Sequence, residues 1–307
     1  MKTNAKASAI SVLLSCVAAF HTLASDELHS SVQLGQGYRH DRLKYSFAGT
    51  HRHPNIISEL DFKNLRVYLT TLKASLSNDT YIGVVEAAYG AIIHGNARES
   101  DYFKENRHGV FSRSISNVHG DHTIDCSAKI GRIFPIFSEV TFTPSIGYGA
   151  FWQRLRIHHV HHTIPRGHIG EQQERDLRRL VSTYSTFWGA PFVEARLSAP
   201  LKSDLTLDLG YTFFYPIRYI GKGNWNLRRL HFTHKNQIEK SYGQKGDISL
   251  RWAYTKRLEY GLTVGIARFT ARDGHVTFKQ SGVAGHLPAH RATRTFVDYL
   301  VTLSYAF

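Results

Sequence analysis

Apolar and polar residues alternate along the last stretch of the chain, from Thr293 to Phe307. Such alternation has the period of a β-strand, in which successive side chains point to opposite faces. The face opposite Asp298 and Thr302 is apolar or aromatic throughout and consists of Val297, Tyr299, Val301, Leu303, Tyr305 and Phe307. A strand with one apolar and one polar face is typical of a membrane barrel, which turns the apolar face to lipid.

The same alternation recurs in earlier segments of the chain. From Leu205 to Phe213, and again from Leu258 to Ile266, every second residue is apolar or aromatic. On the segment that begins at Ile56, the alternation slips by one residue near Asn64. We expect strands near residues 31–47, 56–76, 81–93, 121–133, 140–156, 183–199, 205–220, 247–254, 258–267 and 293–307.

Short and long connections alternate between these segments. Long polar loops are expected at 48–55, 94–120, 157–182, 221–243 and 272–292. Short turns on one rim and long loops on the other are the layout of an outer-membrane barrel. Charged residues occupy the face opposite the apolar one, whereas a soluble lipocalin-like barrel needs an apolar interior. We predict an all-β fold: a transmembrane, antiparallel, up-and-down β-barrel of about ten strands with five long outer loops.

The N-terminal segment predicts export. Lys2 and Lys6 precede an apolar stretch from Ala9 to Phe20, and small residues follow up to Ala24. This is the order of a secretory signal peptide, predicted at 1–24, which leaves 25–307 as the barrel domain. A lipoprotein site at Cys16 is the alternative. The final Phe307 resembles the C-terminal signal that the barrel insertion machinery of bacterial outer membranes reads. We therefore expect the protein in the bacterial outer membrane.

The chain is basic, with 38 Lys and Arg against 24 Asp and Glu, a formal charge of +14 and 12% aromatic residues. Exported proteins do not usually meet nucleic acid, so no nucleic-acid partner is expected. The anionic partner that fits a barrel is outer-membrane lipid, above all lipopolysaccharide phosphate. Only Cys126 remains after the signal peptide, which excludes an intrachain disulfide.

Charged residues on the polar faces of the strands are expected in the lumen. They are Glu59, Asp61, Lys63, Glu86, Asp125, Lys129, Glu194, Arg196, Asp208, Asp247, Arg251, Glu259 and Asp298. Barrels of about eight strands are filled by side chains and those of about sixteen hold an aqueous channel, so ten strands lie near the packed end. The charges could line a narrow path for ions or small solutes, or form a polar network that holds the barrel together.

Two loops carry candidate binding residues. The basic residues of the fourth loop, a candidate site for lipopolysaccharide phosphate or a host polyanion, are Lys222, Arg228, Arg229 and Lys235. The third loop contains His158, His159, His161 and His162. These imidazoles are candidate zinc or copper ligands, but no Cys or carboxylate lies beside them. A solvated, pH-sensitive loop is the alternative, and no cofactor is assigned.

Three stretches are similar to omptins, ten-stranded outer-membrane proteases. They are Ser58 to Lys63, the strand that ends at Tyr89-Gly90, and the triplet Glu99-Ser100-Asp101. Omptins use an acidic pair in loop two and an Asp-x-His pair in loop four, which hold and activate a water. Glu99 and Asp101 correspond to the first pair. The segment 221–234 contains no Asp, so no counterpart of the second pair orients a general base there.

The chain also resembles the Protochlamydia outer membrane protein family. The resemblance is carried by Ile57 to Leu65, by Glu99 to Ser114, and by Gly221 to Arg228. It implies an abundant porin-like barrel and supplies no catalytic residues. The leading interpretation is a barrel, not an enzyme, that passes ions or small solutes or supports the envelope. The alternatives are an omptin-like protease and a surface adhesin that binds polyanions through basic loops. Its oligomeric state is unknown.

Overall fold

A computed structural model describes residues 28–137, 139–164, 181–226, 230–280 and 283–307. The predicted signal peptide at 1–24, including Cys16, lies outside the described residues. The strands are β1 (His29–Phe47), β2 (Ser58–Ser77), β3 (Tyr81–Tyr102), β4 (Val110–Val118), β5 (Asp121–Arg132), β6 (Phe134–Phe137), β7 (Val140–Ile164), β8 (Ser182–Lys202), β9 (Leu205–Phe214), β10 (Arg218–Trp225), β11 (Leu230–Ala253), β12 (Leu258–Gln280) and β13 (Val283–Ala306). Two short 3-10 helices, η1 (Thr50–Arg52) and η2 (Glu105–Arg107), lie in connections. No helix among the described residues is long and apolar enough to cross a membrane.

The strands form one antiparallel sheet that closes on itself where β1 pairs with β13. Two wall positions are shared by consecutive strands: β4 and β5 both lie between β3 and β7, and β9 and β10 both lie between β8 and β11. The short β6 pairs only with β7. Thirteen strands minus these three give a ring of ten, and the predicted barrel of about ten strands is confirmed.

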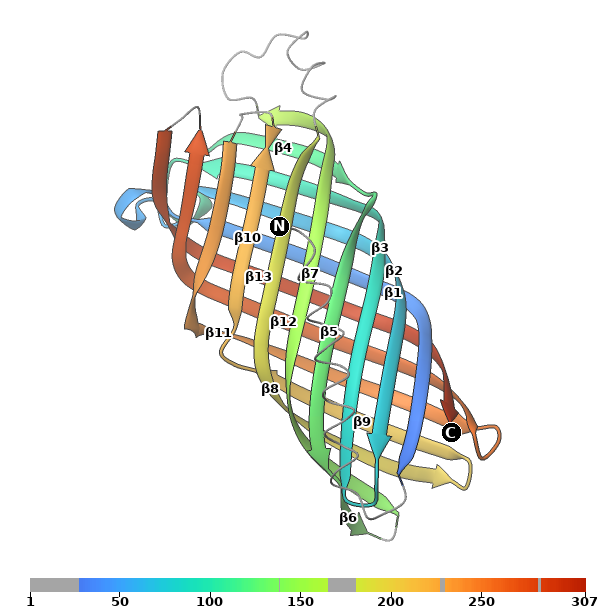
Figure 1. Cartoon of the computed structure of the whole chain (residues 1–307). Coiled ribbons are helices and arrows are strands. Elements are labelled where there is room, and N and C mark those ends of the chain that lie inside the picture. The colour runs from blue at the N-terminus through green and yellow to red at the C-terminus, as the bar shows by residue number, and fades with distance from the viewer. Residues whose placement is uncertain (1–27, 138, 165–180, 227–229, 281–282) are drawn as a thin grey trace, which may run out of the picture.

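One rim carries short turns, and long hairpins extend from the other (Figure 1). The C-terminal strand ends at the short-turn rim, where the Ala306 amide donates to the Arg257 carbonyl. In outer-membrane barrels the short turns face the periplasm, so the hairpins are extracellular. Most of the predicted long loops are in fact strand, because β3, β4, β7, β10, β11, β12 and β13 continue into them.

The outer face of the short-turn half is the lipid face. Its exposed side chains include Ile146, Ile248, Leu262, Ile266 and Val301, each more than half exposed. Exposed aromatic residues end these apolar stretches: Tyr38, Tyr68 and Trp152 toward the hairpins, and Tyr81, Trp252 and Tyr305 toward the turns. Aromatic rings at both ends of an apolar band are the interfacial girdles of a membrane protein.

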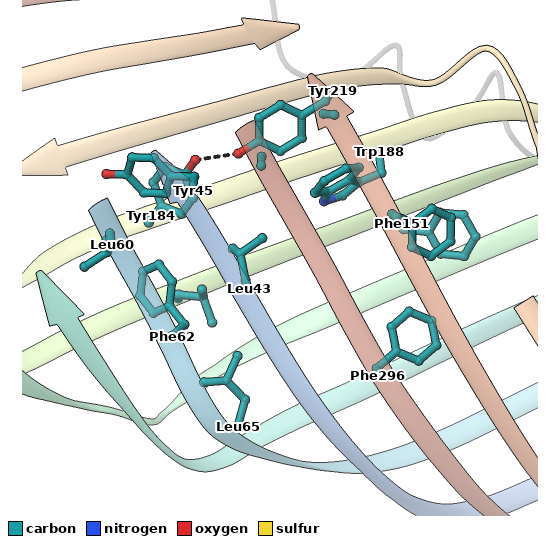
Figure 2. Packing of buried hydrophobic residues seen from close by; sticks show 14 of the residues in the cluster. Leu43, Tyr45, Leu60, Phe62, Leu65, Phe151, Tyr184, Trp188, Tyr219 and Phe296 are labelled. Atoms are coloured by element: carbon teal, nitrogen blue, oxygen red, sulfur yellow. Dashed lines mark hydrogen bonds between the residues drawn. The ribbon is translucent and has the colours of Figure 1, made fainter. Parts of the chain in front are cut away.

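Beyond Tyr38 and Tyr68 the polarity of the wall reverses. On β1, Leu43 and Tyr45 point inward and are buried, while Arg42 and Lys44 point outward. On β2, a bulge at Asn64, whose φ is 52°, moves Leu60 and Phe62 to the interior. The extracellular half is thus a water-exposed barrel with an apolar core (Figure 2).

Candidate functional site

A buried ion-pair network crosses the middle of the lumen. The Arg39 guanidinium donates to Asp298 and to Asp125, each at 2.6 Å, and so joins β1 to β13 and β5. Arg294 donates to Asp41 at 2.8 Å, and both side chains are fully buried. The Gln153 amide on β7 also donates to Asp41, at 3.0 Å. Since β1 and β7 are on opposite sides of the ring, these bonds span the lumen.

Four phenylalanines close the lumen beside this network. They form the aromatic layer: Phe151 on β7, Phe214 on β9, Phe269 on β12 and Phe296 on β13. The Phe151 and Phe269 ring centroids are 4.9 Å apart although their strands lie across the barrel, and no member is more than 8% exposed. The Arg39 guanidinium covers the Phe296 ring at 4.0 Å. Aromatic side chains therefore fill the lumen at this level.

Toward the short-turn rim the lumen is polar and hollow. A cavity of 430 Å³ opens there and continues into an inner cavity of 160 Å³ below the aromatic layer. Three cations of its wall are paired: Lys129 with Glu194, Arg196 with Asp247 at 3.0 Å, and Arg251 with Asp208 and with Glu259. Ten of the expected lumen charges lie inside the barrel: Glu86, Asp125, Lys129, Glu194, Arg196, Asp208, Asp247, Arg251, Glu259 and Asp298.

The assignment of Glu59, Asp61 and Lys63 to the lumen is wrong. The bulge at Asn64 reverses the alternation, so these residues share the outer face of Arg42 and Lys44. Arg42 pairs with Asp61 at 2.7 Å, Lys44 with Glu59 at 3.0 Å, and Lys63 with Asp61 at 3.4 Å. The acids form an ion-pair cluster on the outside of β1 and β2, held by cations that remain partly exposed.

The extracellular interior is packed with aromatic rings. Tyr45 on β1 stacks on Tyr184 on β8, with centroids 4.6 Å apart, although these strands face each other across the ring. The Tyr184 and Tyr219 hydroxyls are hydrogen-bonded at 2.5 Å, as the dashed line in Figure 2 shows. Burial holds the pKa of Tyr45 and of Tyr184 well above the ordinary tyrosine value. These phenols remain neutral at physiological pH.

His234 completes this packing as a buried neutral base. It is 1% exposed and lies 5.0 Å from the Tyr219 ring, and neither ring nitrogen has a hydrogen-bond partner in the described part of the chain. Burial, together with the charge of His275, lowers the pKa of His234 to about 3. The side chain acts as part of the apolar core at neutral pH, and its unpaired nitrogens make this part of the core less stable.

Glu99 and Asp101 point into the extracellular end of the barrel. They pair in register with Leu60 and Ser58, which share the inward face of Phe62. The Trp225 indole donates to Glu99 at 3.2 Å from the opposite wall. The cavity beside them, lined by Leu60, Ser114 and Trp225 among others, has a volume of only 10 Å³. The acidic pair is present in the extracellular interior, but packed side chains fill the space around it.

The four histidines of β7 are not gathered on one face. A bulge at His159, whose φ is 51°, interrupts the alternation, and His158 stacks on His119 with centroids 4.4 Å apart. His161 is exposed, and His162 lies on the opposite face. No group of three or more His, Cys, Asp or Glu among the described residues could hold a metal ion. Burial, together with the charge of His119, lowers the pKa of His158.

Of the predicted anion-binding residues, Lys222 and Lys235 are exposed on neighbouring strands β10 and β11. Arg228 and Arg229 lie outside the described residues. More arginines emerge from the outer wall just beyond the aromatic girdle. We call Arg42, Arg66, Arg154 and Arg268 the outer-wall basic belt, and all four are exposed. Arg66 and Arg154 lie two residues beyond Tyr68 and Trp152, so each shares the outward face of its aromatic neighbour.

Sequence reasoning missed five central lumen residues: Arg39, Asp41, Lys73, Lys245 and Arg294. On β1, β2 and β11 polar and apolar residues do not alternate cleanly around them, as exposed polar residues such as His40 and Arg42 show on β1. Arg294 precedes Val297, where the apolar face of β13 begins. A signal was present, since Arg39 is two residues before Asp41 and both fall on the face opposite Tyr38. Charges on the face opposite an apolar or aromatic residue identify the lumen side.

Comparison with known proteins supports the fold. A family model described as Protochlamydia outer membrane protein matches residues 33–307. The structure is similar to the outer membrane protease OmpT from Escherichia coli, with a TM-score of 0.75, 10% identity, and coverage of 91% of this chain and 97% of that one. The translocator domain of the autotransporter NalP from Neisseria meningitidis also matches, at a TM-score of 0.37 and 11% identity over 99% of this chain and 97% of that one. A sequence search of curated proteins finds no match. The shared architecture with OmpT confirms the omptin-like barrel.

Proposed function

This chain belongs to the Protochlamydia outer membrane protein family, and we propose that it is a sealed structural barrel whose outer wall binds lipopolysaccharide phosphates. Its location in the outer membrane follows from the family and the fold. The sequence left open whether the barrel passes solutes or supports the envelope, and we select the envelope role. It also adopts lipopolysaccharide as the expected partner.

The outer-wall basic belt carries this proposal. Arg268, Thr295 and Arg42 are register partners on β12, β13 and β1, and Arg66 on β2 faces His40 on β1. Three of its arginines, Arg268, Arg42 and Arg66, therefore lie within four adjacent strands at the level where the lipid phosphates of the outer leaflet begin, and Arg154 lies on β7. Arg42 is paired with Asp61, but Arg66 and Arg268 have no carboxylate within 4.0 Å among the described residues. Guanidinium groups suit forked contacts with phosphate.

The packed interior supports the structural role over a conduit. Rings from facing walls meet at 4.9 Å in the aromatic layer and at 4.6 Å in the extracellular core. An ion would have to displace both layers, and ions are costly to transfer into an apolar environment. Refolded protein in a planar bilayer should therefore give no discrete conductance steps. Salt-dependent steps from the correctly folded barrel would restore the porin-like interpretation.

Glycolipid binding is the direct test of the belt. We expect the double variant Arg66→Gln/Arg268→Gln to bind bisphosphorylated lipid A at least about tenfold more weakly in micelles. The matched control, Lys279→Gln, removes an exposed cation from the far end of β12 and should bind normally. The double variant and the control should bind dephosphorylated lipid A with the same affinity. Unchanged binding of the phosphorylated lipid by the double variant would exclude the belt as the site.

Proteolysis is the second candidate, because Glu99 and Asp101 both occupy the inward face of the extracellular end. A carboxylate pair can hold and activate a water if the surrounding core opens. The test is cleavage of a peptide library by the refolded protein, with Asp101→Asn as the variant and Asp79→Asn, in a short turn, as the control. Cleavage that Asp101→Asn abolishes and the control retains would support a protease. Absence of cleavage in all three proteins would remove this candidate.

A further inference from the structure

The polar hollow at the short-turn rim is a chamber that opens among the turn residues. Its outer cavity of 430 Å³ is lined by turn residues such as Lys256 and Arg257, and it shares Lys73 and Glu194 with the inner cavity. Phe151, Phe214 and Phe296 form part of the inner cavity wall and close it above. We call the two cavities together the periplasmic chamber. Its outer volume lies within the range of about 300–1,000 Å³ that is usual for ligand pockets.

The wall of the outer cavity has more cations than carboxylates. Its three carboxylates are Glu194, Asp208 and Glu259, and all of them are ion-paired within the wall. Its six cations are Lys73, Lys129, Arg196, Arg251, Lys256 and Arg257. Lys129, Arg196 and Arg251 form those ion pairs. The other three cations, Lys73, Lys256 and Arg257, take no part in them and lie along the path from the opening inward.

These remaining cations lie in sequence along the chamber. Lys256 and Arg257 are exposed at the opening, Lys73 lies deeper, and Lys245 lines the inner cavity. None has a carboxylate within 4.0 Å among the described residues. Glu86, the register partner of Lys73, is the one acid of the inner wall without such a pair in the described part of the chain. Counted with Arg39, which pairs with both Asp125 and Asp298, the inner wall as a whole is neutral, but its two lysines have only Glu86 as a carboxylate outside the ion pairs.

We propose that the periplasmic chamber binds a small oxyanion solute, one that carries a carboxylate or phosphate group and enters from the periplasm. Lys256 and Arg257 attract the anion to the opening, since a cleft lined by one sign of charge concentrates the opposite ion. Lys73 and Lys245 contact it inside, where low dielectric walls strengthen each charge-assisted hydrogen bond. The aromatic layer stops it there. This site is separate from the outer wall, so it does not depend on the proposed lipopolysaccharide binding, but it rests on the sealed interior of the proposed function.

Calorimetry on the refolded, full barrel in neutral detergent tests this proposal at fixed ionic strength. The probes are inorganic phosphate and succinate, which separate the two oxyanion sources. We expect saturable binding of at least one probe, weakened at least about tenfold by Lys73→Met. The matched control Lys279→Met replaces an exposed lysine on an extracellular hairpin and should leave binding unchanged. Arg66→Gln/Arg268→Gln should also leave it unchanged, which separates this test from that of the basic belt.

Two results would overturn the proposal. One is no saturable binding of either probe by the folded barrel up to about 10 mM, a concentration that would detect even millimolar affinity. The other is equal binding by the wild type and Lys73→Met, which would place the anion elsewhere. Folding of each variant is checked by its heat-dependent gel mobility. If Lys73→Met does not fold, Arg257→Gln, in the exposed turn at the opening, takes its place with the same expected direction.

Discussion

The membrane half and the extracellular half of this barrel have opposite polarity. In the membrane half, Leu262 is 59% exposed on the outer face, and Asp247 lies inside. In the extracellular half, Arg66 lies outside, and Phe62 is fully buried inside. The sheet is continuous between them. The surroundings of the outer face, lipid or water, therefore decide which face of each strand is apolar.

Where the polarity reverses, the residue types on the two faces of a strand change. This happens with a shift in the strand register on β2 and without one on β1. On β1 the alternation is unbroken from Arg39 to Tyr45, and the inward residues change from charged to apolar at Leu43. On β2 the bulge at Asn64 accompanies the change. The polar chamber lies inside the membrane half, and the apolar core lies inside the extracellular half. The extracellular half therefore has the polarity of a soluble domain, and the membrane half has the reverse.

The largest expected effect is in the buried network between the two halves. Asp41→Asn leaves the fully buried Arg294 guanidinium without its main partner, and breaking such a pair should lower the free energy of unfolding by about 3–5 kcal/mol. Urea unfolding in detergent, followed by tryptophan fluorescence, measures this change. A loss below about 1 kcal/mol would mean that water reaches this network and that the halves are not separated by a dry layer.

A second prediction compares the two outer faces. Leu262→Arg places a charge on the lipid face and should cost about 2–4 kcal/mol near the bilayer centre. Thr233→Arg places the same charge on the water-exposed wall beside Lys222 and should change stability by no more than about 0.5 kcal/mol. Unfolding in lipid vesicles measures both changes. Equal costs would contradict the assignment of lipid and water to the two faces.

The pH dependence of the extracellular core gives a smaller effect. The pKa of His234 is lowered to about 3, so above pH 6.5 the ring is neutral in both folded and unfolded chains and no penalty arises. Below pH 6.5 only the unfolded chain gains the proton, which should lower stability by about 1.4 kcal/mol at pH 5.5. Urea midpoints at pH 7.5 and 5.5 measure this. The His234→Phe variant should lose this part of the pH dependence of stability. If its stability fell as much at pH 5.5 as that of the wild type, the loss could not be assigned to His234.

The smallest effect is expected in the periplasmic chamber. The ion pair between Arg251 and Glu259 has side chains that are 32% and 24% exposed to the chamber. Water there screens the pair, so Glu259→Gln should cost no more than about 1 kcal/mol. The same urea assay as for Asp41→Asn gives the comparison. Similar losses for Glu259→Gln and Asp41→Asn would show that the chamber is as dry as the central network.

The alternation was sufficient to predict the membrane half. Leu205 to Phe213, Leu258 to Ile266 and Val297 to Phe307 each form outer-wall strands in the expected phase. The extracellular strands were predicted as loops, because a wall that faces water has polar residues outside and loses the membrane pattern. For the same reason Glu59, Asp61 and Lys63 were placed in the lumen. Their position depends on the bulge at Asn64.

The alternation along the chain predicts the β-barrel, its number of strands and the membrane band, because a strand against lipid must turn its apolar face outward. The division of the interior into a packed core and a polar chamber follows only from the folded barrel. Phe151 and Phe269 meet across the barrel, as do Tyr45 and Tyr184, from strands far apart in the chain. Alternation shows that a side chain points inward but not which side chain it meets. That depends on ring closure, which brings facing walls into contact. The result is a packed aromatic core above a polar chamber.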